Sequence, residues 1–177
     1  METAAIKKLK GSLGYKNDLA VPKIEKIVVN IGVGRMSQQP NFEDRILPEV
    51  MKELALITGQ KPAPTKAKKS IAGFKTRSGQ IIGLKVILRR SRMRDFLKRL
   101  ISVVIPRLRD FKGIDIKNVD KSGNLNIGFR DHLVFPEINP EESKVDFGLE
   151  VSIVSNAKSR NEAVELYRAL GVPLKKD

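Results

Sequence analysis

Basic side chains without acidic neighbours mark the middle of this sequence. Between Glu53 and Asp95 lie 41 residues that include 11 Lys or Arg and no Asp or Glu. The densest part is KPAPTKAKKSIAGFKTRSGQ, residues 61–80, with the cations Lys61, Lys66, Lys68, Lys69, Lys75 and Arg77. A concentrated excess of one charge repels itself, so it favours a partner of the opposite charge. The stretch therefore predicts binding of a polyanion, and nucleic acid is favoured over a membrane surface or a merely solvated face.

The overall composition indicates what kind of protein carries this basic stretch. The 177 residues carry a net charge of +14, and residues 61–99 hold 13 basic residues and one acidic residue. Apolar residues make up 41% of the sequence and charged residues 31%, which is typical of a globular protein with a real core. We expect a single domain over 1–177, with the basic segment predicted to bind nucleic acid at about 61–99.

Several classes of protein are disfavoured. No run of about 18 apolar residues is present, so we expect no membrane span. The first residues lack the apolar block of a secretory signal, and the absence of cysteine excludes disulfides and thiolate metal sites. We therefore expect a cytoplasmic protein.

The residue types that usually perform catalysis are poorly placed. A metal-dependent nuclease needs carboxylates beside the phosphate it cleaves, and pairs such as Glu141–Glu142 lie far from the basic stretch in sequence. His132, the only histidine, is expected to be a solvent-exposed structural residue. We predict no catalytic residues, no metal site, no cofactor and no enzymatic activity.

NIGVGR, residues 30–35, has some features of a dinucleotide-binding loop. Gly32 and Gly34 fit that motif, but Ser37 stands where the third glycine belongs, and no glycine begins a Walker phosphate loop. The two glycines are better explained by a strand end that needs close backbone approach.

The basic stretch itself is predicted to be largely loop and turn, because it contains Pro62, Pro64, Gly73 and Gly79. A protruding loop of this kind suits irregular RNA better than a DNA duplex, which is usually read by a helix. Phe74 is its only aromatic residue. Phe74 could stack on an exposed base, or it could anchor the loop to the core, and the sequence leaves both open.

Four segments alternate as strands do, namely 23–34, 80–90, 124–129 and 147–154. Helices are predicted near 1–14, from a cap at Asn41 to Gly59, from a cap at Ser91 to Pro106, and from the Ser159–Glu162 capping box to Gly171. Pro48 either kinks the second helix or begins its regular part. Residues 110–123 and 131–145 are predicted loops.

This order predicts an α+β fold, an antiparallel sheet of about five strands with helices packed on one face and basic loops extending from it. The uncovered face would then carry Lys26, Asn30, Lys85 and Arg89 beside the basic loop.

Several stretches carry a family resemblance: KIEKIVVNIGVG, ELALITGQKPAPTKAKKSIAGFKTRSGQIIGLKVILRR, IPRLRDFKGI and GNLNIGFRDHLVFPEI. In order and spacing they resemble the bacterial form of large-subunit ribosomal protein five over nearly the whole chain. The resemblance implies binding of 5S ribosomal RNA, its linkage to 23S ribosomal RNA in the central protuberance, and contact with small-subunit ribosomal protein thirteen and with neighbouring central-protuberance proteins. It also implies an extended loop that reaches the P-site transfer RNA.

The resemblance carries over to individual residues. The implied 5S-binding set is Asn30, Gln60, Lys61, Thr65, Lys66, Lys68, Lys69 and Ser70, with Arg89 and Arg90 against the RNA backbone, and Lys85 joins it as a cation of the uncovered face. The implied transfer-RNA loop is 72–80, with Gly73, Phe74, Lys75, Thr76, Arg77, Ser78 and Gly79.

Three departures stand against the family pattern. Ile87 occupies a strand position where relatives commonly have a Thr that contacts RNA, Pro48 is unusual for its helix, and residues 139–148 follow the pattern loosely. Two other functions stay open at this point. A nucleic-acid enzyme would show a carboxylate cluster folded against the basic face, and a DNA-binding architectural protein would bind duplex DNA equally well.

Overall fold

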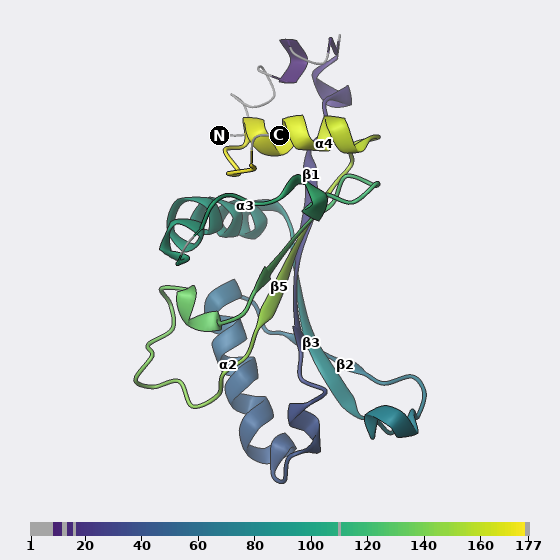
Figure 1. The fold of residues 1–177 in the computed structure, drawn as a ribbon, viewed down its shortest axis with the longest axis vertical. Coiled ribbons are helices and arrows are strands. Elements are labelled where there is room, and N and C mark those ends of the chain that lie inside the picture. The colour runs from purple at the N-terminus through teal and green to yellow at the C-terminus, as the bar shows by residue number, and fades with distance from the viewer. Residues whose placement is uncertain (1–8, 12–13, 16, 110, 176–177) are drawn as a thin grey trace. The chain divides into compact units, whose positions relative to one another are not determined.

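The computed structural model describes residues 9–11, 14–15, 17–109 and 111–175, and these fold as two compact units (Figure 1). Unit 1 draws on 1–27, 89–127 and 152–177, and unit 2 on 28–88 and 128–151. The predicted helix at 1–14 falls mostly outside the described residues.

The strands form one five-stranded antiparallel sheet in the order β2-β3-β1-β5-β4. Their bounds are β1 (Ile24–Gly32), β2 (Ala63–Lys66), β3 (Ile81–Leu88), β4 (Leu125–Phe129) and β5 (Leu149–Ser155). The predicted α+β class, with helices and an antiparallel sheet of about five strands, is confirmed.

Alternation along the strands of unit 2 separates a buried face from an exposed one. Val29 and Ile31 of β1, with Leu84, Val86 and Leu88 of β3, are at most 2% exposed. Strand β3 contacts α2 (Leu47–Thr58), whose buried apolar stripe includes Val50, Leu54 and Ile57. Asn30 and Lys85 alternate with the buried residues and are exposed, as the sequence pattern predicts.

Strand β2 was not predicted, because Pro62 and Pro64 indicate loop. It is a short edge strand antiparallel to β3, with Ala63 opposite Lys85 and Thr65 opposite Gly83. Proline lacks the N–H that an inner strand needs, but an edge strand tolerates it. The pairing turns the basic stretch into a hairpin that projects from unit 2 (Figure 1).

The start of α2 shows that Pro48 lies where the regular part of the helix begins. Residues Phe42–Ile46 form a π-helical turn, and the regular helix begins at Leu47 with Pro48 in its first turn. Proline is tolerated in the first turn of a regular helix, where its fixed φ angle suits the helical backbone. The predicted cap at Asn41 is wrong, since Asn41 has a left-handed backbone and makes no capping hydrogen bond.

In unit 1, α3 (Arg90–Arg99) continues through a π-helical turn, Leu100–Val104, and ends in a short turn that contains Pro106. Its buried residues include Met93, Phe96, Leu100 and Val104. The predicted cap at Ser91 is wrong, because the helix already includes Ser91 and its first position has no side-chain cap.

Helix α4 (Arg160–Ala169) confirms its predicted cap. The Ser159 hydroxyl accepts a hydrogen bond from the Glu162 backbone N–H at 3.3 Å. Tyr167 lies fully buried in this helix and donates to the carbonyl oxygens of Gly123 and Ile153. Burial raises the pKa of Tyr167 to about 12, so its hydroxyl stays protonated as a donor.

Candidate nucleic-acid interface

The projecting hairpin presents its cations to solvent. Its exposed basic residues in unit 2 are Lys61, Lys66, Lys68, Lys69, Lys75, Arg77 and Lys85. Within the described part of the chain, none of these seven forms an ion pair with a carboxylate. Their charges are therefore available to an external anion.

Residues 58–60, at the end of α2, fix the path of the chain into the hairpin. Gly59 takes the left-handed conformation (φ 66°) that ends the helix, which favours glycine. The buried Thr58 hydroxyl donates to the Leu54 carbonyl at 2.7 Å. Gln60 then turns toward β3, and its side-chain amide donates to the Ile87 carbonyl at 3.3 Å. Gln60, a predicted RNA-binding residue, thus also has a structural contact.

Thr65 and Gly83 meet across the β2–β3 pair. A Cβ atom at Gly83 would lie 2.7 Å from the Thr65 hydroxyl and 3.0 Å from the Ile31 carbonyl, which is closer than real side chains come. Glycine at 83 therefore lets the Thr65 side chain lie across the strand. The structure brings Thr65 and Lys85 to neighbouring positions of one hairpin, and both are predicted RNA-binding residues.

Residues 67–80, called the hairpin tip from here on, are more ordered than a loop prediction implies. Ala67 donates to the Gln80 carbonyl at 2.8 Å, and Gly79 donates back to the Ala67 carbonyl at 2.9 Å. Further out, Ile71 and Thr76 bridge each other around a short 3₁₀ turn, Ala72–Phe74. The tip is a continuation of the hairpin with its own hydrogen bonds.

Side chains from the segment after β1 hold the tip in place. Gln38 donates to the Phe74 carbonyl at 3.1 Å, and Gln80 donates to the Ser37 hydroxyl at 2.9 Å. Neither Ser37 nor Gln38 stood out in the sequence, because their role depends on contacts with residues more than 30 positions away. In the tip, Ser70 accepts from the Ser78 backbone N–H at 2.9 Å, so part of its hydrogen-bonding capacity is used.

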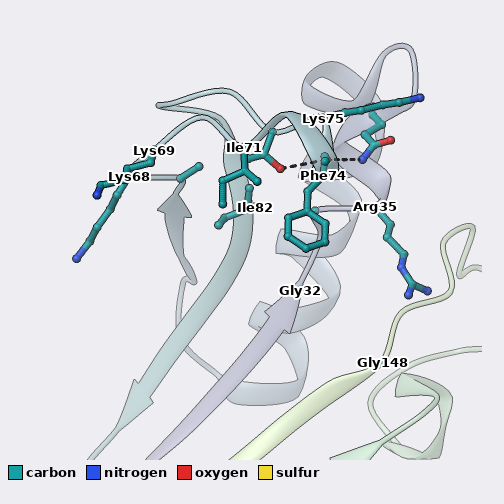
Figure 2. A pocket seen from close by; sticks show the side chains of 14 residues that line it. Gly32, Arg35, Lys68, Lys69, Ile71, Phe74, Lys75, Ile82 and Gly148 are labelled. Carbon is teal, nitrogen blue, oxygen red and sulfur yellow. Dashed lines mark hydrogen bonds between the residues drawn. The ribbon is translucent and has the colours of Figure 1, made fainter.

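Phe74 is not an anchor to the core. Its side chain is 72% exposed, so the alternative in which it ties the loop to the interior is wrong. Beside it lies a hollow of about 1150 Å3, the tip groove, lined by residues of the hairpin tip and of the end of β1. Figure 2 shows the Phe74 ring between Lys68 and Lys69 on one side and Arg35 on the other.

Arg89 and Arg90 belong to unit 1, where both are exposed at the start of α3. Arg90 has a left-handed backbone (φ 53°), which is uncommon for a residue with a side chain. The remaining predicted site residues lie in unit 2.

His132 contradicts its prediction. It is fully buried rather than solvent-exposed, and its Nε2 atom lies 3.0 Å from the Glu53 carboxylate and 3.0 Å from the Ser143 hydroxyl. Its ring stacks on Phe147 with centroids 4.0 Å apart. The available signal was Glu53, an acidic residue within the apolar stripe of α2. A carboxylate on a buried helix face needs a partner.

Two further observations concern metal sites and membrane-spanning helices. The described residues contain no group of three or more acidic, histidine or cysteine side chains arranged to hold a metal ion. Among the same residues, no helix has the length and apolar character required to cross a membrane.

Comparison with protein families decides the relationship of this chain. Residues 17–77 match the model described as ribosomal protein L5, and residues 81–174 match the model that describes the C-terminus of the same ribosomal family. The chain belongs to the ribosomal protein L5 family.

Curated relatives in this family cover nearly all of the sequence. The large ribosomal subunit protein uL5 of Halothermothrix orenii is 46% identical over 168 residues, which is 95% of this chain and 92% of the relative. The uL5 proteins of Geobacter sulfurreducens and Fusobacterium nucleatum are 48% and 46% identical, covering 96% and 99% of this chain and 93% of each relative.

Membership of the L5 family settles the general function. The protein is a structural, non-enzymatic constituent of the large ribosomal subunit, and its partners are ribosomal RNA and ribosomal proteins. The predicted family and the predicted absence of enzymatic activity are confirmed. The individual RNA-contact residues stay predictions.

Proposed function

We propose that this L5-family protein binds 5S ribosomal RNA through the exposed surface of unit 2 formed by Asn30, Lys85 and the β2–β3 hairpin. The observation that carries the proposal is the set of seven exposed hairpin and strand cations without a described acidic partner. Phosphate groups would neutralise these charges, and the release of their counterions would drive binding.

Polar side chains on the same surface would supply shape recognition. Asn30 is exposed and makes no side-chain hydrogen bond with a described residue, so its amide is available to RNA. On the edge strand β2, the Thr65 hydroxyl lies next to Gly83 of β3. Hydrogen bonds from such groups to ribose and base edges favour one RNA fold over another, while the cations bind any phosphate backbone. Ile87 is half-buried and its backbone carbonyl accepts from Gln60, but its side chain offers RNA no hydroxyl of the kind expected from relatives.

The bound 5S RNA would be linked to 23S ribosomal RNA in the central protuberance, and the protein would also contact small-subunit ribosomal protein thirteen. Residues 72–80, the outer part of the hairpin tip, would reach the P-site transfer RNA. Support for this last contact comes from its projection from unit 2 and from its exposed Phe74, Lys75 and Arg77.

Competition at matched, near-physiological salt tests the central proposal. The labelled protein is titrated with purified 5S RNA and, separately, with duplex DNA of equal length. We expect 5S RNA to bind at least a hundredfold more tightly, because shape contacts add to the shared electrostatic attraction. Equal affinities would leave only non-specific phosphate binding, and the proposal would be wrong.

A further inference from the structure

The tip groove combines an apolar surface with a basic rim. Apolar contact is offered by Ile71 and Phe74 of the hairpin tip and by Ile82 at the start of β3. Four cations also line it: Arg35, Lys68, Lys69 and Lys75. No acidic residue is among the described residues that line the groove. Its volume is about 1150 Å3, slightly above the roughly 300–1,000 Å3 typical of small-molecule sites, so it has room for one nucleotide.

The apolar groups of the groove are exposed to an unusual degree. Phe74 is 72% exposed and Ile71 is 49% exposed, and both are among the few large apolar side chains left open on the described surface. The backbone that carries them is held by the Ile71–Thr76 bridge and by the hydrogen bond from Gln38 to the Phe74 carbonyl. The ring is therefore presented by a fixed support, which lowers the entropy lost when a ligand binds.

One wall of the groove consists of backbone. Gly32 and Gly34 line it at the end of β1, and a Cβ atom at Gly32 would meet no other atom within 4 Å. A side chain at position 32 would therefore enter open space rather than the packed interior. The absence of side chains there leaves room for a flat ring to lie against the strand end.

We propose that the tip groove holds one unstacked nucleotide of an RNA partner, with its base against Phe74 and Ile71 and its phosphate beside the rim cations. The proposal rests on the proposed RNA-binding function and adds to it the chemical feature that is recognised. A nucleotide matches both properties of the groove, because every base has a π-face and every linkage carries a negative charge. An apolar peptide would match the ring but not the four cations.

Methyl NMR of the full-length protein, labelled at its isoleucine methyl groups, tests this directly. The probe is a single-stranded hexamer of adenylate, and the control is an abasic hexamer with the same number of phosphates. We expect the hexamer to shift the Ile71 and Ile82 methyl signals upfield in a saturable way, because both would lie near the face of a bound adenine. The abasic strand should leave these two signals in place. Equal shifts with both strands would overturn the proposal in favour of a phosphate site.

Substitutions then block the groove without removing charge. Gly32→Val should abolish the methyl shifts, whereas Gly128→Val, at an exposed β4 glycine that also has no atom within 4 Å of a Cβ, should preserve them. Phe74→Ala should weaken hexamer binding about tenfold, and Phe74→Tyr should restore it. Unchanged shifts in Gly32→Val would contradict the proposal. So would similar shifts produced by acetyl-phenylalanine amide, which would indicate a protein-binding groove.

Binding measurements made in parallel test this inference independently of the proposed function. They also identify which RNA supplies the nucleotide. Gly32→Val should lose at least fivefold either in 5S RNA affinity or in retention of transfer RNA by reconstituted ribosomes, and the affected partner supplies the nucleotide. If the wild-type protein prefers 5S RNA but its methyl signals do not move with the hexamer, this inference alone fails. If 5S RNA binds no better than duplex DNA, the proposed function fails, whatever the methyl signals show.

Discussion

Two long segments of unit 2 are both predicted largely as loops, and the fold treats their charged side chains in opposite ways. The hairpin tip, 67–80, is basic and has no acidic residue, whereas the segment 131–145 is rich in acidic residues. The tip keeps its cations in solvent and is held together by backbone hydrogen bonds. The segment 131–145 instead places an ionisable ring, His132, in the interior against Glu53.

The two segments differ in whether the partners of their charged side chains lie inside or outside the fold. The partners of His132 lie inside the fold: its Nε2 atom is 3.0 Å from both the Glu53 carboxylate and the Ser143 hydroxyl, and Phe147 stacks on its ring, so these contacts bear on the stability of unit 2. The cations of the hairpin have no described carboxylate partner, so their counterpart must come from outside. Substitutions in the first group should change folding, and substitutions in the second should change binding.

The largest effect is expected at His132. His132→Leu leaves the Glu53 carboxylate buried without its partner, which should lower the free energy of unfolding by about 3–5 kcal/mol. Urea titration followed by circular dichroism measures this. The double variant His132→Leu with Glu53→Leu should recover most of the loss, because it removes both polar groups together. A loss below about 1 kcal/mol in the single variant would show that the pair contributes little to the fold.

The contrast between these segments also marks how far sequence could predict this structure. Strands β1, β3, β4 and β5 and the helices α2, α3 and α4 could be predicted, because the sequence patterns that indicate them are local. Strand β2 did not, since its prolines indicate loop and only its edge position permits them.

The sequence predicts an exposed His132, because no residue near it in the sequence indicates a buried partner. Its partner Glu53 lies on α2, about 80 positions away, and only the fold brings the two together. The exposed cations of the site were predictable because charge is a local property. The supports of the tip, Ser37 and Gln38, were not, because their contacts are long-range.

The next largest effect distinguishes Asn30 from Gln60, two residues with side-chain amides that are both predicted to bind RNA. Asn30→Ala should weaken 5S RNA binding by about 1–3 kcal/mol and leave stability unchanged, since its side chain is exposed. Gln60→Ala should also lower stability, by about 1 kcal/mol, because it loses the hydrogen bond to Ile87. Filter binding and urea titration of both variants separate the two cases. If Asn30→Ala unfolds unit 2 while its folded fraction binds normally, Asn30 is structural.

The smallest effect is expected at the hairpin tip. Lys75→Ala with Arg77→Ala should weaken the hold of reconstituted ribosomes on P-site transfer RNA by about 1 kcal/mol, as expected for partly solvated phosphate contacts in salt. Binding of 5S RNA by the isolated variant should be nearly unchanged. The rate of transfer-RNA dissociation provides the measurement. A variant that loses 5S binding and retains transfer RNA normally would reverse the proposed division between residues 72–80 and the rest of the hairpin.

The salt dependence of 5S RNA binding tests most directly whether the unpaired hairpin cations bind RNA phosphates. If about six phosphates are engaged, the wild-type affinity should fall on the order of a thousandfold between about 50 and 200 mM salt. The variant in which Lys66, Lys68 and Lys69 are all changed to Ala should lose about 2.7 from the slope of log affinity against log salt, with unchanged stability because these side chains are exposed. A slope equal to that of the wild-type protein would place the RNA-binding surface elsewhere and contradict the account.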